Sequence, residues 1–333
     1  MMSVASGLLC VALDPGPGQW LHRLARDFLV RPPEFPWRMA LGARCTDVFG
    51  TEFDEYCMTR ALGDGATIAE AGSLLETANW RAGGILLAAA GWPVELTLVK
   101  AAQDRHLRIG QYVETWYGYR RRLAPAPEWP APDHLLLPDA AAVVEAAAEG
   151  IDAAHIHVVG NPVWEDVVAD SGGNEAQWLF IDAPVRRDYA DSLGYDENDA
   201  WRLVAAEHRR RNMTTTILFA PHPTDAARPI PEGAIAVRYQ TSLLDRAGTV
   251  FGMFSAPLID AYLRGRRVIS VQPNLRRDMN PLSRRRLIPL ATNPDTLRSA
   301  LDSQRCNVDS DFQLALSGSL GRLRSATEEI MHA

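Results

Sequence analysis

Short apolar runs alternate with longer amphipathic segments along most of the chain. In the first half, the runs lie at 7–13, 38–42, 84–90, 108–113, 134–137 and 156–160. Segments with helical spacing follow several of them, including 20–29, 94–104 and 140–150. Apolar runs without polar alternation are typical of strands buried on both faces, and intervening helices are typical of βαβ units. The pattern therefore predicts a parallel α/β domain.

A second series of runs begins after an interruption near 160–175. It includes 177–182, 215–221, 234–238, 249–254 and 267–273. The length of 333 residues suits two domains better than one core. We therefore predict an α/β fold of two Rossmann-like domains facing across a cleft, over 1–163 and 164–310. A C-terminal helix in 311–333 is expected to cross back to the first domain.

Composition and charge exclude several classes of protein. The net charge of −7 argues against non-specific nucleic-acid binding. Without an apolar stretch of roughly 20 residues or a basic leader, we expect no transmembrane segment or signal peptide and a cytoplasmic protein. The four cysteines have no C-x-x-C spacing, which predicts reduced thiols and no zinc site.

Candidate site residues are sought after the apolar runs, because ligands of parallel sheets bind beyond the carboxyl ends of the strands. After the first run, Gly16 and Gly18 allow close approach of a ligand to the backbone. A helix beginning near Gln19 directs the positive end of its dipole at the same point. A tight turn without a ligand explains these residues equally well.

Two further strand ends in the first half carry polar and aromatic side chains. Trp92 and Glu95 stand at a helix start, although the helix dipole alone explains Glu95. Glu114 follows the run at 108–113 and is a candidate general base, while Trp116 and Tyr117 are candidates for stacking on a sugar. The alternative is an acidic cap beside solvated arginines at 120–122.

Histidines in the first half suggest structure rather than metal binding. His155 and His157 alternate along one strand, so they share a face. Without a nearby third ligand, this pair favours a structural role, and we predict no metal site.

The second half presents a histidine and a helix start at its strand ends. His222 and Pro223 follow the run at 215–221. Ser255 and Ala256 precede a helix whose first turn contains Pro257, a position where proline is well tolerated. Asp260 lies about one turn further along.

These motifs together resemble a known group of enzymes. G-N-P at 160–162, H-P at 222–223 and S-A-P-L-I-D-A-Y-L-R-G-R-R-V-I at 255–269 are similar to nucleotide-sugar enzymes of the GT-B architecture. Within this superfamily, the chain looks closest to bacterial surface-polysaccharide glycosyltransferases. The non-hydrolysing UDP-N-acetylglucosamine 2-epimerases are relatives with the same architecture. Segments 114–123, 178–184 and 193–197 add to the resemblance.

The resemblance implies roles for the residues at the strand ends. Glu114 and His222 are the implied catalytic residues, as the base and as a contact to the donor phosphates. The implied donor-binding residues are Gly16, Gly18, Gln19, Asn161, His222, Pro223, Ser255, Ala256 and Asp260. The implied acceptor-side residues are Trp92, Glu95, Trp116 and Tyr117.

Departures from the family pattern narrow the predicted function. Epimerases of this type carry S-G-G-x-x-E-E where this chain has S-A-P-L-I-D-A, so the doubled carboxylate is absent. No D-x-D motif follows a predicted strand, and no G-x-G-x-x-G of an oxidoreductase follows the first one. We therefore predict metal-independent transfer of a sugar. A carboxylate base acting in a one-step displacement predicts inversion at the anomeric carbon. The alternatives are a UDP-sugar 2-epimerase-like enzyme and an inactive nucleotide- or sugar-binding protein.

The predicted partners follow from this function. The nucleotide-sugar is a substrate, and no cofactor is expected. The acceptor is a sugar, a lipid-linked molecule or a small molecule. Peripheral membrane contact and a homo-oligomer are left open.

Overall fold

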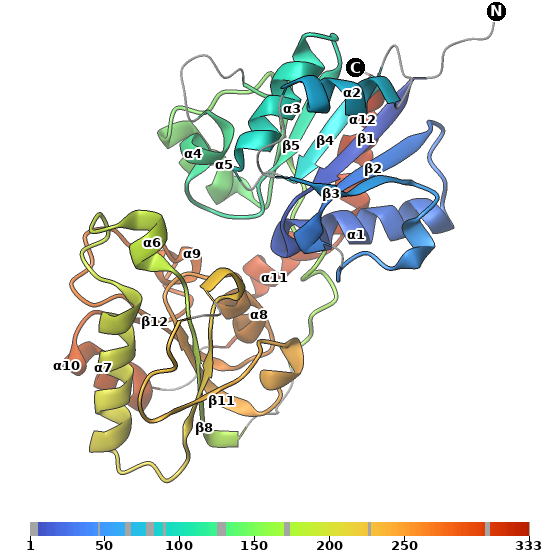
Figure 1. The fold of residues 1–333 in the computed structure, drawn as a ribbon. Helices are drawn as coiled ribbons and strands as arrows, with labels where there is room; N and C mark the ends of the chain where they lie inside the picture. The colour runs from blue at the N-terminus through green and yellow to red at the C-terminus, as the bar shows by residue number, and fades with distance from the viewer. Residues whose placement is uncertain are drawn as a thin grey trace, which may run out of the picture. The chain divides into compact units, whose positions relative to one another are not determined.

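Two parallel β-sheets flanked by helices make up the computed structural model of the protein (Figure 1). It describes residues 6–45, 47–63, 68–77, 83–88, 91–124, 131–169, 174–225, 228–303 and 307–332. The chain divides into an N-terminal unit, Met1–Asp166 with Leu314–Ala333, and a C-terminal unit, Val167–Gln313. The predicted α/β fold with two Rossmann-like sheets is confirmed.

In the described part of the N-terminal unit, seven parallel strands have the order β3-β2-β1-β4-β5-β6-β7. The strands are β1 (Gly7–Ala12), β2 (Trp37–Gly42), β3 (Cys57–Leu62), β4 (Gly83–Ala88), β5 (Arg108–Tyr112), β6 (His134–Leu137) and β7 (His155–Val158). The helices are α1 (Pro15–Val30), α2 (Ile68–Thr77), α3 (Pro93–Gln103), α4 (Tyr119–Leu123), α5 (Ala140–Ala148) and α12 (Ser319–His332), with short 3₁₀ helices at Ala43–Cys45 and Thr51–Phe53.

The central strands of this sheet are buried on both faces, as their unbroken apolar runs predict. In β1, Leu8 and Cys10 face a core shared with α1 and α12, whereas Leu9 and Val11 face a core shared with α3. Helix α12 lies against β4 and β5 (Figure 1). A Cβ at Gly110 would lie only 2.4 Å from Cδ1 of Ile330, so the helix packs directly on the strand backbone.

In the described part of the C-terminal unit, six parallel strands have the order β10-β9-β8-β11-β12-β13. The strands are β8 (Asn174–Ile181), β9 (Ile217–Ala220), β10 (Ala234–Ala236), β11 (Ala247–Gly252), β12 (Arg267–Val271) and β13 (Leu290–Ala291). The helices are α6 (Val185–Tyr189), α7 (Glu197–Arg210), α8 (Pro257–Leu263), α9 (Pro281–Arg284), α10 (Pro294–Asp302) and α11 (Ser310–Leu316), with 3₁₀ helices at Pro223–Asp225 and Thr241–Leu243.

Three features differ from the sequence prediction. The first helix begins at Pro15 rather than near Gln19, because proline fits the first helical turn. The expected C-terminal helix is two helices, α11 and α12, separated at Gly318, which has φ of +71°. Strands β3 and β13 lack a long apolar run and were not predicted.

No helix among the described residues combines the length and the apolar content needed to cross a membrane. The described cysteines, Cys10, Cys45 and Cys57, are free thiols, as expected. Cys306 lies outside the described residues.

Candidate functional site

The strand order of the N-terminal sheet reverses at β1, which has β2 on one side and β4 on the other. In parallel sheets, this reversal opens a crevice at the carboxyl ends of the strands. Asp14 follows β1, Trp92 follows β4 and Glu114 follows β5. The fold therefore directs these three residues to the same edge of one sheet.

Asp14 links three segments of this edge. Its carboxylate accepts a hydrogen bond from Nε1 of Trp92 at 2.5 Å and forms an ion pair with Arg44 at 3.0 Å. The Arg44 guanidinium also lies over the Trp92 ring, 4.4 Å from its centroid. This arrangement fixes the Trp92 indole, an expected acceptor-side residue, but uses its N–H within the protein. The sequence analysis did not identify Asp14 or Arg44, although Asp14 occupies a strand end.

Glu114 is a carboxyl group with a raised pKa at this edge. Its side chain is half-buried, and Oε1 lies 3.7 Å from where a Cβ would stand on Gly16. Burial raises the pKa of the Glu114 carboxyl to about 7, opposed by the charge of Arg122 and assisted by that of Asp14. A carboxyl group with a pKa near neutrality is partly ionised at physiological pH, and its ionised form accepts a proton more readily than an ordinary carboxylate.

The glycines expected to form a ligand-binding turn lie instead inside α1. Because α1 begins at Pro15, Gly16 and Gly18 belong to its first turn, and the Gly18 N–H donates to the Asp14 carbonyl at 2.8 Å. A Cβ on Gly18 would lie 3.2 Å from Sγ of Cys45, so this glycine packs closely against the Cys45 side chain. Gly16 and Gln19 are exposed. Of the two glycines, Gly16 is the one that lies next to the Glu114 carboxyl group.

Two expected acceptor-side residues have structural roles, which corrects the prediction. The Trp116 side chain is only 2% exposed, stacks on Trp164 and donates to Asp139 at 2.8 Å, so its ring cannot stack on a sugar. Glu95 is buried, and its carboxylate accepts the backbone N–H groups at 91 and 92, which caps α3.

Two other predicted residues occupy turns of the N-terminal unit. Tyr117 is half-buried beside Gly118, the residue that precedes α4. Asn161 is buried, and its side-chain oxygen accepts the Val163 N–H at 2.9 Å. The Asn161 side chain therefore stabilises the turn at the end of the first sheet.

The C-terminal sheet has its own reversal of strand order, between β8 and β11. Ile181 and Gly252 are paired across these strands, and a Cβ on Gly252 would lie 2.9 Å from the Ile181 carbonyl oxygen. Asp182 and Ser255 follow the two strands at this close approach. This edge of the C-terminal sheet therefore carries an acidic side chain and a hydroxyl.

Ser255 places a buried hydroxyl at this edge. Within the described part of the chain, its Oγ has no hydrogen-bond partner, as is also true of Oδ1 of Asp182. Burying a hydroxyl without a hydrogen-bond partner costs free energy of folding. Such a hydroxyl is therefore a candidate contact to a ligand. Ala256, next to it, is exposed and takes a helical conformation before α8.

A buried polar network supports the loop that carries Ser255. The Met253 carbonyl accepts the Ser270 hydroxyl at 2.6 Å and the Asn280 amide at 3.0 Å. The Gln272 side chain donates to Ser270 at 2.9 Å and to Asp278 at 2.6 Å. The loop after β11 is thus held by side chains from β12 and from the loop that follows it.

Asp182 is compensated by Arg228. Both side chains are largely buried, and Arg228 also donates to the Asn198 side chain at 2.6 Å. Burial raises the pKa of the Asp182 carboxyl, while its hydrogen bond and ion pair with Arg228 oppose that shift. The sequence analysis included this aspartate in a resembling segment but did not name it as a site residue.

The remaining predicted donor residues also lie at the carboxyl edge of this sheet or close to it. His222 is half-buried after β9, and its carbonyl accepts the Asp225 N–H at 2.9 Å across the 3₁₀ turn that includes exposed Pro223. The Asp260 carboxylate pairs with Arg264 at 3.1 Å and accepts from Tyr239 Oη at 3.4 Å. Asp260 is therefore fixed within its own unit.

Comparisons with known proteins identify the fold but not the reaction. No protein-family model and no curated protein sequence matches the chain. Similar solved structures include the UDP-GlcNAc 2-epimerase of Methanocaldococcus jannaschii in complex with UDP-GlcNAc and UDP (TM-score 0.66, 13% identity, covering 97% of this chain and 99% of that one). A putative UDP-N-acetylglucosamine 2-epimerase from Listeria monocytogenes has a TM-score of 0.64 and 15% identity, covering 98% of both chains.

A glycosyltransferase is also similar. The lipopolysaccharide outer core galactosyltransferase WaaB, in its apo form, has a TM-score of 0.56 and 12% identity, covering 97% of this chain and 99% of that one. The predicted resemblance to GT-B nucleotide-sugar enzymes is therefore confirmed for the fold, which epimerases and glycosyltransferases share.

Proposed function

We propose that the protein is a glycosyltransferase that moves a sugar from a nucleotide-sugar to an acceptor hydroxyl, with inversion and without a metal ion. The main support for this proposal is the environment of Glu114. Its carboxyl group is half-buried after β5 and has a pKa raised to about 7. At neutral pH, such a group can remove a proton from an alcohol as the alcohol becomes a nucleophile.

The proposed chemistry is a single displacement. The acceptor oxygen attacks the anomeric carbon, its proton passes to Glu114, and the bond between the sugar and the diphosphate breaks. We assign the acceptor to the edge that carries Trp92 and Tyr117, beside Gly16 and Glu114.

We assign the nucleotide to the C-terminal unit. The Ser255 hydroxyl would donate to the diphosphate, with the backbone at Ala256 and the ring of His222 beside it. Asp260, held by Arg264 and Tyr239, would accept from the ribose. Hydrogen bonds to the departing diphosphate stabilise its developing charge, so this arrangement would promote bond breaking.

A 2-epimerase is the second candidate, because the two epimerase structures have TM-scores of 0.66 and 0.64, against 0.56 for the galactosyltransferase. The missing doubled carboxylate at 255–261 argues against it. Such an enzyme would convert its nucleotide-sugar without an acceptor, which separates the two candidates experimentally.

The first test is a thermal-shift panel with UDP, CMP, CDP, GDP, dTDP and NAD, repeated with His222→Ala. A ligand that binds only the folded state raises the melting temperature. We expect one nucleoside diphosphate to act selectively and the shift to fall in the variant. No shift with any nucleotide would contradict the proposal.

The second test measures turnover of the matching nucleotide-sugars with a set of sugar and lipid-linked acceptors. Glu114→Gln should slow transfer by about 10²–10⁴-fold while the nucleotide-induced shift remains, because the variant lacks only the base. The exposed Glu34, which precedes β2 at the opposite edge of the sheet, provides the matched control Glu34→Gln. Full activity of Glu114→Gln excludes the assigned base. A second epimer formed without acceptor identifies an epimerase, and binding without turnover identifies a binding protein.

A further inference from the structure

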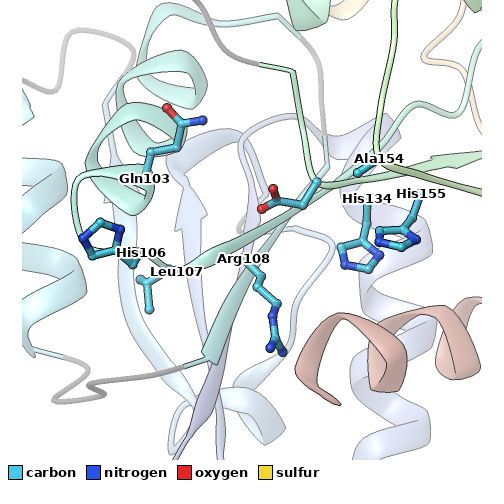
Figure 2. Close-up of a pocket in the computed structure, with 8 residues that line it drawn as sticks. Gln103, His106, Leu107, Arg108, His134, Ala154 and His155 are labelled. Atoms are coloured by element: carbon cyan, nitrogen blue, oxygen red, sulfur yellow. The ribbon is translucent and has the colours of Figure 1, made fainter. Parts of the chain in front are cut away.

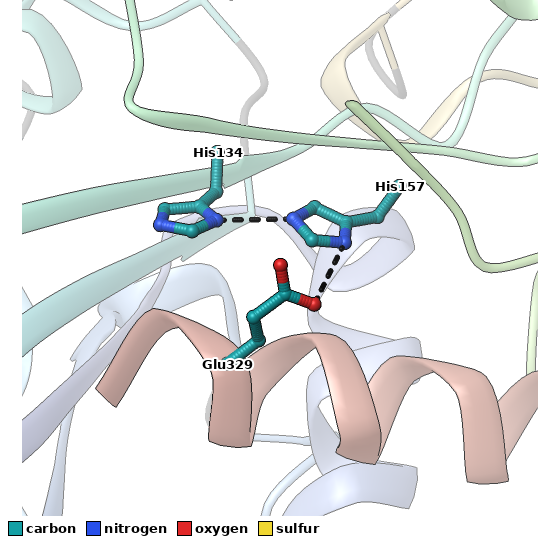
Figure 3. A group of neighbouring side chains, drawn as sticks. All are labelled: His134, His157 and Glu329. Carbon is teal, nitrogen blue, oxygen red and sulfur yellow. Dashed lines mark hydrogen bonds and ion pairs between the residues drawn. The ribbon is translucent and has the colours of Figure 1, made fainter. Parts of the chain in front are cut away.

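Three potential metal ligands meet at the edge of the N-terminal sheet opposite to Glu114. His134 is the first residue of β6, and His157 lies on the neighbouring strand β7, where it is paired with Leu136. Glu329 extends from α12 toward the two imidazoles (Figure 3). The sequence alone places His157 near His155 and offers no third ligand. The two further ligands come from distant elements, His134 from β6 and Glu329 from α12.

The ligand atoms are close enough to share one ion after small side-chain movements. One suitable atom from each residue lies within 4.8 Å of the others. Nδ1 of His134 is 3.0 Å from Nε2 of His157, whereas Glu329 pairs at 3.7 Å with the other nitrogen of that ring, Nδ1. An ion held by all three residues would therefore replace the hydrogen bond between the imidazoles, and the rings would turn so that one nitrogen of each points at the ion.

The three residues differ in their exposure to solvent. His134 is buried, His157 is half-buried and Glu329 is exposed. The Glu329 side chain is 55% exposed, so it can rotate toward an ion without disturbing the core.

A cavity of about 470 Å³ gives solvent access to this cluster. His134 and His155 line it together with His106, Arg108 and Asp133 (Figure 2). The His155 ring stacks on His134 with 4.8 Å between the centroids, which fixes the plane of the ligand ring. The cavity therefore borders the cluster on the side of His134.

We propose that His134, His157 and Glu329 bind a divalent transition-metal ion, with Zn²⁺ as the reference ion. Two imidazoles and one carboxylate are an established ligand set for zinc with one open position. The ion would join α12 to β6 and β7. The site needs none of the residues assigned to sugar transfer.

The test uses untagged full-length protein, freed of metal with a chelator and then titrated with ZnCl₂. We expect one ion per chain by equilibrium dialysis and, at 100-fold excess over the dissociation constant, a rise in melting temperature of roughly 5–10 °C. Co²⁺ in place of Zn²⁺ should give the visible absorption of a tetrahedral nitrogen- and oxygen-ligated ion.

Variants separate this site from a simple hydrogen-bonded histidine pair. His157→Ala should abolish stoichiometric binding and the thermal shift. Glu329→Gln, at a largely exposed position that should not affect folding, should weaken binding at least 10-fold. His106→Ala, which changes the same cavity without removing a ligand, should bind as the wild type does. No stoichiometric ion in the wild type, or binding that survives Glu329→Gln and His157→Ala unchanged, overturns the proposal.

Discussion

The carboxyl edges of the two sheets have the same topological origin but different chemistry. At the N-terminal edge, Asp14, Arg44 and Trp92 satisfy one another, and a carboxyl group with a raised pKa stands beside them. At the C-terminal edge, Asp182 is compensated by Arg228, while the hydroxyl of Ser255 lacks a partner among the described residues.

The roles proposed for the two units rest on this difference. A group poised near neutral pH suits proton transfer, whereas an unpartnered donor on a rigid loop suits recognition of an anion. Related folds can thus provide reactivity in one half and binding in the other, according to which polar groups each edge leaves unsatisfied. The following three experiments test this contrast.

The largest expected effect is on the charge pair of the C-terminal edge. Arg228→Met leaves the buried Asp182 carboxylate without its cation, which should lower the free energy of unfolding by about 3–5 kcal/mol. Chemical denaturation at pH 7 measures this loss. In the control, Arg202→Met removes an exposed arginine paired with Asp199, at a cost of less than about 1 kcal/mol. Equal losses in the two variants would show that the Asp182 pair is no more important than a surface pair.

A smaller effect is expected when the unpartnered hydroxyl is removed. Ser255→Ala should weaken binding of the nucleoside diphosphate by about 10- to 100-fold, the usual worth of a hydrogen bond to a charged group. The stability of the ligand-free protein should not fall, because Oγ has no protein partner to lose. Calorimetric titration and thermal unfolding measure the two quantities. Ser242→Ala, at an exposed position before β11, is the control. Unchanged affinity in Ser255→Ala removes the proposed phosphate contact.

The smallest effect concerns the pH dependence of stability at the N-terminal edge. The pKa of Glu114 is raised from 4.5 to about 7, so the folded protein holds this proton in a range where the unfolded chain has released it. The resulting stability is complete below pH 4.5 and is lost as the pH rises through 7.

Glu114→Gln should therefore stabilise the protein at pH 8 by about 1–2 kcal/mol, allowing for partial screening by solvent, and by little at pH 4.5. Urea unfolding at both pH values gives the comparison, and Glu34→Gln should show no such dependence. A variant equally stable relative to wild type at both pH values would mean that Glu114 titrates normally.

The sequence predicts the central strands well because burial on both faces requires continuous apolar runs. Strand β3 has no continuous apolar run and was not predicted. It lies at the sheet edge, is half-exposed and contains Thr59 and Arg60. The start of α1 was misplaced because Pro-Gly-Pro-Gly is typical of a turn, although its prolines also fit a first helical turn.

Site residues are harder to predict, because their roles depend on neighbours distant in sequence. Glu114 could be proposed from its place after a strand, but the burial that raises its pKa appears only in the folded chain. Trp116 occupies a similar strand end, yet Trp164 and Asp139 fix it inside the unit. Likewise, α12 brings Glu329 to histidines far from it in the sequence.

The return of α12 to the first sheet also has a consequence for biosynthesis. During translation, residues 1–166 leave the ribosome long before Leu323 and Ile330, which fill part of their core. At usual elongation rates, this interval lasts about 10–30 s. Throughout it, the nascent chain presents the apolar face of β4 and β5 uncovered, while the whole C-terminal unit is being synthesised. The second unit therefore has the opportunity to fold before the first is complete, and chaperone demand should be concentrated on the half that is made first.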